Sequence, residues 1–270
     1  MMKLQTLTIL VFSAFLAACS GGASVQPLYI ERPVEAIYRS AHKELMNRNY
    51  TFAAQEFDEV ERQHPYSKWA RRALVMSAYT YYLQNKYDEA IATARRFLAL
   101  YPGNSQAPYA YYLIAISQYE RISDVRRDQY TTELAQGALM EVRRRYPDSD
   151  YARDAVLKID LTRDNLAAKE MEVGRFYLYR GDYLAAAGRF RNVIEQFGTT
   201  SHVPEALHRL TEVYVSLGVV HEAQNAAAVL GYNFPDSQWY KDSYRILRQR
   251  DLTPVKDEKS WISRALDTVF

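Results

Sequence analysis

The sequence has one cysteine, few glycines and, beyond its first residues, no long hydrophobic run. The single cysteine among 270 residues is Cys19, so the chain can form no internal disulfide. No later stretch approaches the roughly eighteen apolar residues that a membrane-spanning helix needs. Glycine occurs 10 times and tyrosine 23 times. Few glycines and many large amphipathic side chains favour helix-on-helix packing, with stability that comes from packing alone.

The sequence also lacks the patterns of the common enzyme classes. There are 5 histidines, and the His221-Glu222 pair begins like a zinc-peptidase helix, but Asn225 stands where the second histidine would be. No Gly-x-Ser-x-Gly elbow and no glycine-rich phosphate loop occurs. None of the Asp and Glu residues lies in an isolated apolar run that would raise its pKa for acid catalysis. We therefore expect no catalytic site, no bound metal and no enzymatic activity.

The chain also lacks a large excess of positive or negative charge. The formal net charge is +2, and it falls to about +1 if residues 1–18 are removed, because Lys3 is the only charged residue among them. Arginine runs such as Arg71-Arg72 and Arg143-Arg144-Arg145 are interspersed with acidic residues. This balance is typical of solvated helix faces and gives no basic footprint for a nucleic acid.

The first residues have the pattern of an export signal. Lys3 precedes a short apolar stretch from Leu7 to Ala18, which is too short to span a bilayer. The segment Leu16-Ala17-Ala18-Cys19 resembles the lipobox of bacterial lipoproteins, with Cys19 as the lipid attachment residue. By the same resemblance, Ser20 rather than Asp favours the outer membrane. We expect a lipid-anchored protein at the periplasmic face of the cell outer membrane, with no cofactor besides the lipid on Cys19.

A helix-stopping pattern recurs five times and divides the chain into repeats. Each occurrence has a helix-stopping residue followed by a Ser, Asp or Asn able to cap the next helix. The intervals between occurrences are 37, 45, 51 and 37 residues, so the second and third contain insertions. The five segments are 64–67, 101–105, 146–149, 197–201 and 234–237.

Small residues keep a constant distance from these stops. Twelve residues before the proline or glycine of each stop the residue is always alanine: Ala53, Ala90, Ala135, Ala186 and Ala223. Twenty-four residues before it, the residues are Ala41, Ala78, Gly174 and Thr211, and in the third repeat a small residue, Ala115, is displaced by eight positions. Small side chains let two helix axes approach to roughly 8–10 Å. The spacing resembles the tetratricopeptide repeat. It predicts an all-α solenoid of about five helix-turn-helix repeats with a C-terminal capping helix.

The two insertions locate the departures from regular repeats. The first lies around Ile122 to Gln129, and the second predicts one long helix from about Tyr151 to Arg180. A capping helix is expected from about Gln238 to Arg250. In the tail, Trp261, Ile262, Ala265, Leu266 and Val269 share one face, which could dock on the protein itself or on a partner. The expected organisation is 1–18 signal peptide, 19–33 linker, 34–149 substrate-side repeats, 150–250 long helix with docking repeats and cap, and 251–270 tail.

The first helices of the N-terminal repeats are rich in aromatic residues. Such helices line the concave face of this repeat class, and aromatic rings bury much area with little loss of side-chain entropy. Most of these rings are expected in packing between helices and the rest in a substrate groove. The residues assigned to this groove are Tyr38, His42, Tyr79, Tyr82, Tyr109 and Tyr112, with Tyr119 further along the same face.

The chain resembles the BamD family, lipoproteins of the outer-membrane β-barrel assembly machinery. Besides the lipobox, the resemblance rests on residues 31–38 (ERPVEAIY), on 122–129 with the Ile122-Ser123-Asp124-Val125 loop, and on 169–177 (KEMEVGRFY) leading into Gly181-Asp182-Tyr183. It covers roughly residues 14–250. A generic repeat protein has no reason to carry the 122–129 loop. The alternative is another periplasmic tetratricopeptide lipoprotein that binds peptidoglycan or cell-division proteins.

The resemblance implies a non-enzymatic scaffold that helps insert β-barrel proteins into the outer membrane. Members dock on the POTRA domains of a BamA-like barrel protein through their C-terminal repeats, and Arg189 matches a family position facing that partner. Their N-terminal repeats form a pocket for unfolded outer-membrane β-barrel substrates. The implied partners are therefore these two, other Bam lipoproteins, and the membrane through the lipid anchor, with no nucleic acid.

Overall fold

The computed structural model describes residues 30–266, and within them the chain is entirely helical. The expected signal peptide and Cys19 lie outside the described residues. No helix in 30–266 is both long enough and apolar enough to traverse a bilayer. The helices are α2 (Val34–Met46), α3 (Tyr50–Gln63), α4 (Lys68–Leu83), α5 (Tyr87–Leu100), α6 (Ala107–Tyr119), α7 (Tyr130–Arg145), α8 (Asp150–Arg180), α9 (Tyr183–Gln196), α10 (Val203–Leu217), α11 (Val220–Asn233), α12 (Gln238–Arg248) and α13 (Trp261–Leu266).

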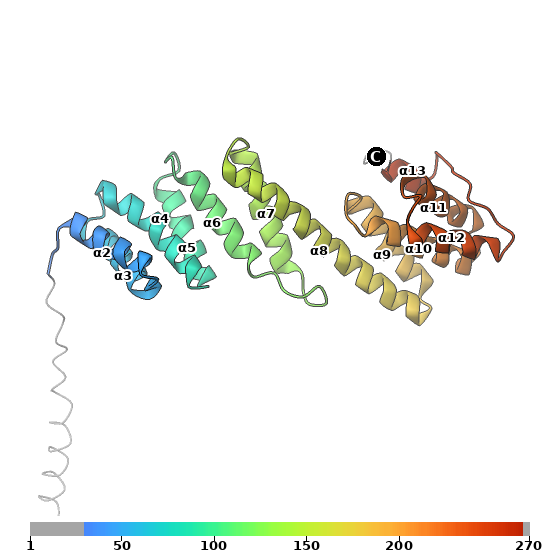
Figure 1. The fold of residues 1–270 in the computed structure, drawn as a ribbon, viewed down its shortest axis with the longest axis horizontal. Helices are drawn as coiled ribbons and strands as arrows, with labels where there is room; N and C mark the ends of the chain where they lie inside the picture. The colour runs from blue at the N-terminus through green and yellow to red at the C-terminus, as the bar shows by residue number, and fades with distance from the viewer. Residues whose placement is uncertain (1–29, 267–270) are drawn as a thin grey trace, which may run out of the picture. The chain divides into compact units, whose positions relative to one another are not determined.

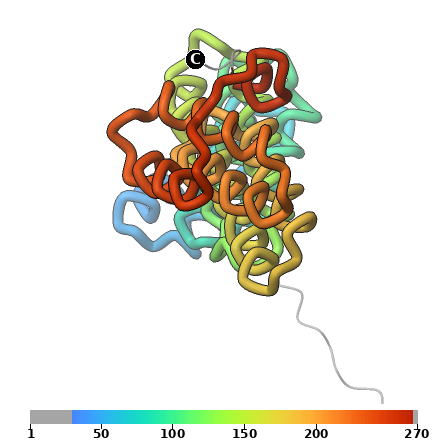
Figure 2. The backbone as a smooth tube through the Cα atoms, turned by 90° about the vertical axis from the view of Figure 1, so that its right-hand side faces the viewer, coloured from blue at the N-terminus to red at the C-terminus, as the bar shows by residue number. Residues whose placement is uncertain are grey.

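These helices form five antiparallel pairs, stacked one after another in chain order and followed by α12 (Figure 1). Several of the helices are amphipathic and bury one stripe; α3, for example, buries Ala53, Phe57 and Val60, spaced four and three residues apart. The predicted solenoid of five tetratricopeptide-like repeats with a capping helix is confirmed. Figure 2 looks along the stack from its C-terminal end and shows the segment after α12 folded back over the last repeats.

The predicted register of small residues is confirmed by burial. All five second-helix alanines are fully buried, as are the small residues of the first helices. At Gly174 the helices are so close that a Cβ atom would lie 2.5 Å from Cε1 of Phe190. Glycine is therefore required at this crossing. The fully buried alanines are Ala53, Ala90, Ala135, Ala186 and Ala223.

The helix caps follow the sequence pattern in three of five repeats. The hydroxyls of Ser67, Ser149 and Ser237 accept hydrogen bonds from the first turns of α4, α8 and α12. Ahead of α6 and α10 the expected cap by a Ser, Asp or Asn is absent, because the N-cap residues are Gln106 and His202 and make no capping side-chain bond. Each of these two helices has a proline in its first turn, which has no N–H to satisfy.

The long helix predicted from the second insertion is present. α8 runs from Asp150 to Arg180 over 31 residues. In its first half Ile159 packs in a core with α6 and α7, and in its second half Met171 packs in a core with α9 and α10. The first insertion is the irregular segment between α6 and α7, which includes Ile122 to Gln129 as expected.

The tail docks on the protein itself as far as it is described. α13 packs against α9 and α11, and Ile262 and Leu266 are 0% and 2% exposed. The guanidinium of Arg191 lies over the Trp261 ring, 4.6 Å from its centroid. Of the two possibilities open at the sequence level, the structure shows the intramolecular one for these residues, while Val269 lies outside the described part.

Candidate binding surfaces

A row of tyrosines runs across the first helices of consecutive repeats. The Tyr109 ring of α6 lies 6.3 Å from Tyr79 of α4 and 5.4 Å from Tyr151 of α8, measured between centroids. Tyr151 lies a further 5.2 Å from Tyr112. All four rings are half-buried, so each is held by neighbours and keeps one part open to solvent. Together with Tyr82 these residues form what we term the tyrosine row.

Carboxylates fix two hydroxyl groups of the tyrosine row. The Tyr82 hydroxyl donates to Glu120 at 3.3 Å and the Tyr112 hydroxyl donates to Asp154 at 2.5 Å. Burial and then the charge of Glu120 raise the pKa of Tyr82 to about 12. Burial, followed by the bond to Asp154, raises the pKa of Tyr112 as well. The two hydrogen bonds to carboxylates therefore restrain the orientations of the Tyr82 and Tyr112 rings.

A cavity opens beside the tyrosine row, between the turns that precede α6 and α8. Its volume is about 460 Å³, and its walls include Gln106, Pro108, Tyr109, Ser149 and Tyr151. Ring faces can pack on apolar or aromatic side chains, and the amide and hydroxyl groups can hydrogen-bond a peptide backbone.

Two of the residues assigned to the groove lie apart from the tyrosine row. Tyr38 packs at the N-terminal end, with its ring 4.7 Å from Trp69 and 5.5 Å from Phe57. His42, on the next turn of α2, is exposed and outside this series of rings. Tyr119 is half-buried and Lys158 lies over its ring, 5.6 Å from the centroid.

The sequence interpretation missed Tyr151 and Trp69, although a signal for both was present. Each stands four residues after the proline of a stop segment, and Trp239 has the same position in the last one. This position opens the first helix of the next unit. An aromatic residue there packs back on the preceding repeat, as Tyr151 does on Tyr109.

Arg189 lies on α9 with its side chain 41% exposed, and it already has a partner within the chain. One guanidinium nitrogen is 3.2 Å from both carboxylate oxygens of Glu170 on α8. Asn192 donates to the same carboxylate at 3.3 Å. Arg189 is therefore partly exposed and at the same time held by an ion pair within the chain. The pair leaves other guanidinium N–H groups for a partner carboxylate.

The segment 169–177 carries side chains that link α8 to other parts of the chain. The Lys169 ammonium donates to the carbonyls of Arg126 and Arg127, at 3.0 and 3.2 Å, and so ties the 122–129 loop to α8. Within the loop the buried Gln129 side chain donates to three backbone carbonyls, those of Asp124, Val125 and Arg127. The motif and the loop belong to one hydrogen-bonded unit.

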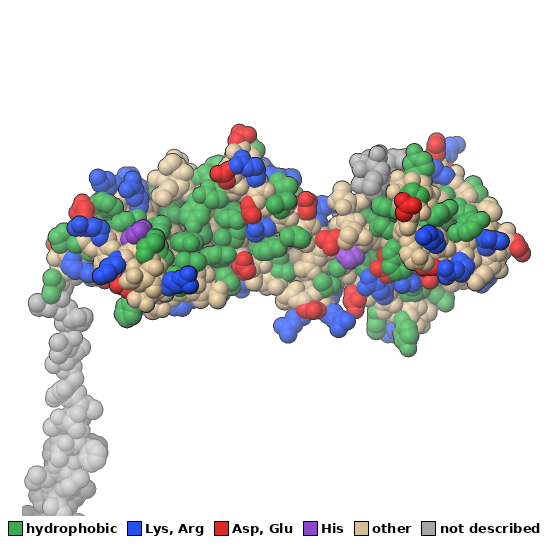
Figure 3. Space-filling model, in the orientation of Figure 1, with side chains coloured by type: hydrophobic (Ala, Val, Ile, Leu, Met, Phe, Trp, Pro, Cys, Tyr) green, Lys and Arg blue, Asp and Glu red, His purple; other side chains and the backbone are tan. Residues whose placement is uncertain are grey.

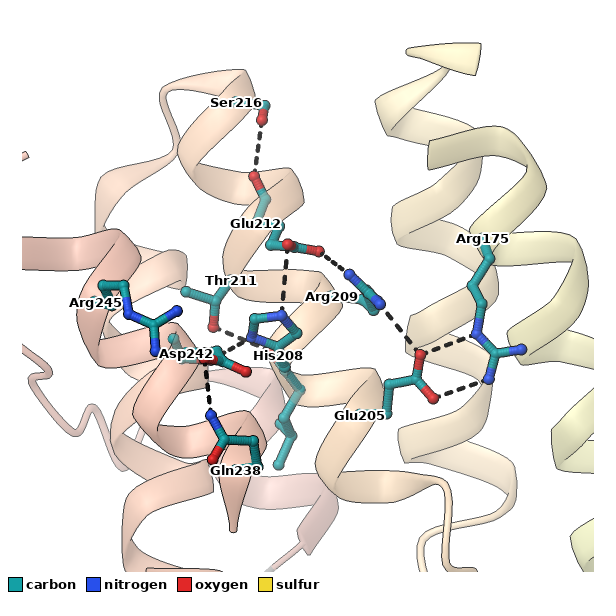
Figure 4. A network of polar contacts seen from close by, with 12 residues as sticks. Arg175, Glu205, His208, Arg209, Thr211, Glu212, Ser216, Gln238, Asp242 and Arg245 are labelled. Atoms are coloured by element: carbon teal, nitrogen blue, oxygen red, sulfur yellow. Dashed lines mark hydrogen bonds and ion pairs between the residues drawn. The ribbon is translucent and has the colours of Figure 1, made fainter. Parts of the chain in front are cut away.

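A chain of charged groups connects α8, α10 and α12 in the C-terminal repeats (Figure 4). Arg175 grips Glu205 with two hydrogen bonds of 2.9 and 2.8 Å. Arg209 lies 3.4 Å from Glu205 and 2.7 Å from Glu212. The buried His208 then joins Glu212, at 3.4 Å, to the Ser243 hydroxyl of α12, at 2.9 Å. Each member of the network therefore has at least one partner among the others.

Across residues 30–266, no cluster of three or more His, Cys, Asp or Glu side chains is positioned to bind a metal ion. The C-terminal repeats instead offer exposed apolar residues at the α8–α9 turn, where Tyr179 is 93% and Leu184 77% exposed. The surfaces that can bind something are thus the tyrosine row with its cavity, the face around Arg189, and the exposed apolar positions.

Among solved structures, a tetratricopeptide protein of Thermus thermophilus matches with a TM-score of 0.38 and 18% identity, over 79% of this chain and 98% of that chain. Three curated sequence relatives are each named outer membrane protein assembly factor BamD. The protein of Caulobacter vibrioides is 51% identical over 93% of this chain and 82% of its own length. The Rickettsia prowazekii protein is 40% identical, over 92% of this chain and 98% of its own. The Neisseria meningitidis serogroup A protein is 31% identical, over 90% and 96%.

The family profile agrees with these relatives. The profile of the YfiO family, described as outer membrane lipoproteins, matches residues 30–230. This range takes in the tyrosine row, the 122–129 loop and the segment 169–177. The chain belongs to the BamD (YfiO) family of outer membrane protein assembly factors.

Proposed function

We propose that the chain is a non-enzymatic scaffold of the outer-membrane β-barrel assembly machinery, held at the periplasmic face by lipid on Cys19. Its relatives are assembly factors of the outer membrane, and the chain serves the same process. The observation that carries the scaffold assignment is the tyrosine row. It offers half-exposed rings in fixed orientations, spread over three consecutive repeats.

The row suits unfolded segments of β-barrel proteins. Strands of such barrels alternate apolar and polar residues and carry aromatic residues at both membrane interfaces. An extended segment can place alternate side chains against successive rings while its backbone meets the polar groups beside the cavity. We propose this groove for substrate and the C-terminal repeats, through Arg189, for the POTRA domains of a BamA-like partner.

The groove is tested by titrating a fluorescent peptide, the last strand of an outer-membrane β-barrel protein, against the full-length protein. The double substitution Tyr109→Ser and Tyr151→Ser removes two rings from the cavity wall and is expected to weaken binding about tenfold or more, since aromatic anchors dominate such surfaces. Tyr179→Ser removes a 93% exposed ring elsewhere and serves as the matched control. If the double variant and Tyr179→Ser bind the peptide with equal affinity, and circular dichroism shows intact helices in both, the groove assignment is disproved.

A further inference from the structure

The stacking of the repeats is interrupted at one place. First helices of consecutive repeats contact each other in the pairs α2–α4, α4–α6, α6–α8 and α10–α12, whereas α8 and α10 approach each other much less. The reason is the length of α8. Its 31 residues are about twice the 13 of α6 or the 15 of α10. At 1.5 Å per residue the excess is roughly 24 Å, more than the width of one packed helix.

The interruption leaves an open slot. It lies between the first half of α8 and the turn from α9 to α10, with a volume of about 520 Å³. In Figure 3 the surface is hollowed there, at the middle of α8. The residues that line the slot are Leu157, Asp160, Leu161, Arg163 and Asp164 of α8 and 199–201 of the turn.

The apolar side chains of the slot are uncovered. Leu157 is 65% and Leu161 58% exposed, and they lie one helical turn apart on the same face of α8, with Val156 beside them at 38%. Two large aliphatic side chains at this spacing form the surface on which an amphipathic helix packs.

The charge left in the slot is negative. Asp160 has no ion-pair or hydrogen-bond partner among residues 30–266. Asp164 accepts from the Ser201 hydroxyl at 2.8 Å and lies 3.4 Å from Nε2 of His202, and its side chain remains 42% exposed. Arg163 also lines the slot, but its guanidinium is engaged, donating to the carbonyl of Gln196 at 3.0 Å and lying 6.0 Å from the centroid of the Phe197 ring, so the two aspartates leave a net negative charge. A basic side chain on the occupant would complement this slot.

The chain itself contains an example of how such a surface is covered. α13 is a short helix that packs on α9 and α11 with two aliphatic side chains four residues apart, Ile262 and Leu266. A basic residue, Arg191, lies beside them over the Trp261 ring. The slot offers the same kind of apolar stripe. The charged residues beside it are the acidic Asp160 and Asp164, whereas the residue beside α13 is the basic Arg191.

We propose that the slot binds an amphipathic helix of another protein, which carries two aliphatic side chains one turn apart and a lysine or arginine beside them. Such a helix would lie between the first half of α8 and the turn that joins α9 to α10. The slot does not include Arg189 or the tyrosine row. It is a separate docking surface and does not depend on what those two bind.

Site-specific photocrosslinking in the intact assembly tests the proposal. Leu161 is replaced by p-benzoylphenylalanine in the full-length lipoprotein, cells are irradiated, and the crosslinked peptide is sequenced by mass spectrometry. We expect one dominant product, in a helical segment with a basic residue next to its apolar stripe. The same replacement at Leu100, which is 55% exposed on α5, is the matched control. A product in a β-strand, a lipid adduct, or the same products at both positions would overturn the proposal.

Two substitutions give an independent readout from the same photocrosslinker. Asp160→Lys is expected to reduce the yield at position 161 about fivefold or more, because it places like charge against the basic residue of the helix. Glu133→Lys makes the same change at an exposed position of α7 and should have no effect. Leu157→Ser should abolish the product while the melting temperature of the isolated protein stays unchanged. Undiminished yields with Asp160→Lys and Leu157→Ser would overturn the proposed helix.

Discussion

Alanine and glycine at the helix crossings set how closely the two helices of each repeat approach. A single extra carbon at Gly174 would contact the Phe190 ring at 2.5 Å. The alanines of the second helices are equally enclosed, with no exposed surface. Because interiors are close-packed, an added side chain there must displace a helix rather than fill a void.

A pair of identical substitutions on α5 measures this effect. Ala90→Leu adds three carbons at a fully buried crossing and is expected to lower the free energy of unfolding by about 1–3 kcal/mol. Ala92→Leu makes the same change at an exposed position of the same helix and should alter it by less than about 0.5 kcal/mol. Urea denaturation of both variants compares them. Similar losses would mean that the assigned register is wrong.

Arg189 is the second residue whose surroundings decide its role. Arg189→Ala is expected to weaken binding of purified POTRA domains at least about tenfold, since truncating one member of a desolvated charge pair costs about 2–5 kcal/mol. Glu170→Gln removes the internal partner of Arg189 and keeps the guanidinium, so it should bind nearly as tightly as wild type. Arg95→Glu, in the second repeat, should also leave binding unchanged.

The three Arg189 comparisons separate docking from internal structure. If Glu170→Gln loses as much affinity as Arg189→Ala, the ion pair merely positions α9 against α8. Wild-type binding by Arg189→Ala would refute the docking assignment. Isothermal titration of the full-length proteins distinguishes these outcomes, with melting temperatures recorded for each variant.

At the scale of elements, α8 determines how the repeats are connected. Its first half completes the core of the third repeat and its second half begins that of the fourth. The segment 169–177 lies in the second half and carries the side chains that reach outward to the 122–129 loop, to α9 and to α10. The bidentate Arg175–Glu205 pair links α8 directly to α10, beside the core that the two helices share with α9.

This link should make stability depend on acidity. Burial of Glu205 opposes its charge, but the hydrogen bonds and charge of Arg175, followed by those of Arg209, outweigh burial and hold the pKa of Glu205 below its ordinary value. A depressed pKa contributes stability that is present above the unfolded-state value near 4.5 and is lost as pH falls through the folded-state value.

Glu205→Gln is therefore expected to lower stability at pH 7 by at most about 1 kcal/mol, because Arg175 stays partly exposed and keeps Glu172 as a partner. It should also flatten the acid side of the stability profile. Thermal melts from pH 7 down to about pH 3 follow both effects, because the contribution of Glu205 is lost below the unfolded-state value, with the exposed Glu133→Gln as control. A variant whose melting temperature falls as steeply with acid as that of wild type would contradict the assignment.

At the scale of the whole molecule, the proposed lipid on Cys19 determines where the scaffold acts. One acyl chain gives only marginal membrane affinity, whereas several acyl chains on one residue hold a protein firmly. Cys19→Ser is expected to leave uncleaved precursor or soluble periplasmic protein. Fractionation of outer membranes from cells depleted of the BamA-like partner measures this. Retention of the variant in that fraction would show that something other than lipid attaches it.

The sequence by itself determined the repeat class, the register of small residues, the length of α8 and the site of the first insertion. These features depend on short-range rules, namely which residues stop a helix and which fit where two helices cross. Even the missed Tyr151 and Trp69 obey such a rule, since both stand at one position of the repeat. Family membership also rests on segments that can be recognised without coordinates.

Only the tertiary structure decided which faces meet. The Arg189–Glu170 pair joins residues 19 apart in sequence on two helices, and no periodicity predicts which of several carboxylates an arginine reaches. α13 docks on its own repeats because a matching apolar surface on α9 and α11 is free, and His42 stays outside the tyrosine row because its face of α2 turns to solvent. The slot beside Leu157 and Leu161 exists because α8 is longer than the neighbouring helices. Only the packing of the helices shows that no described residue of this chain fills that space.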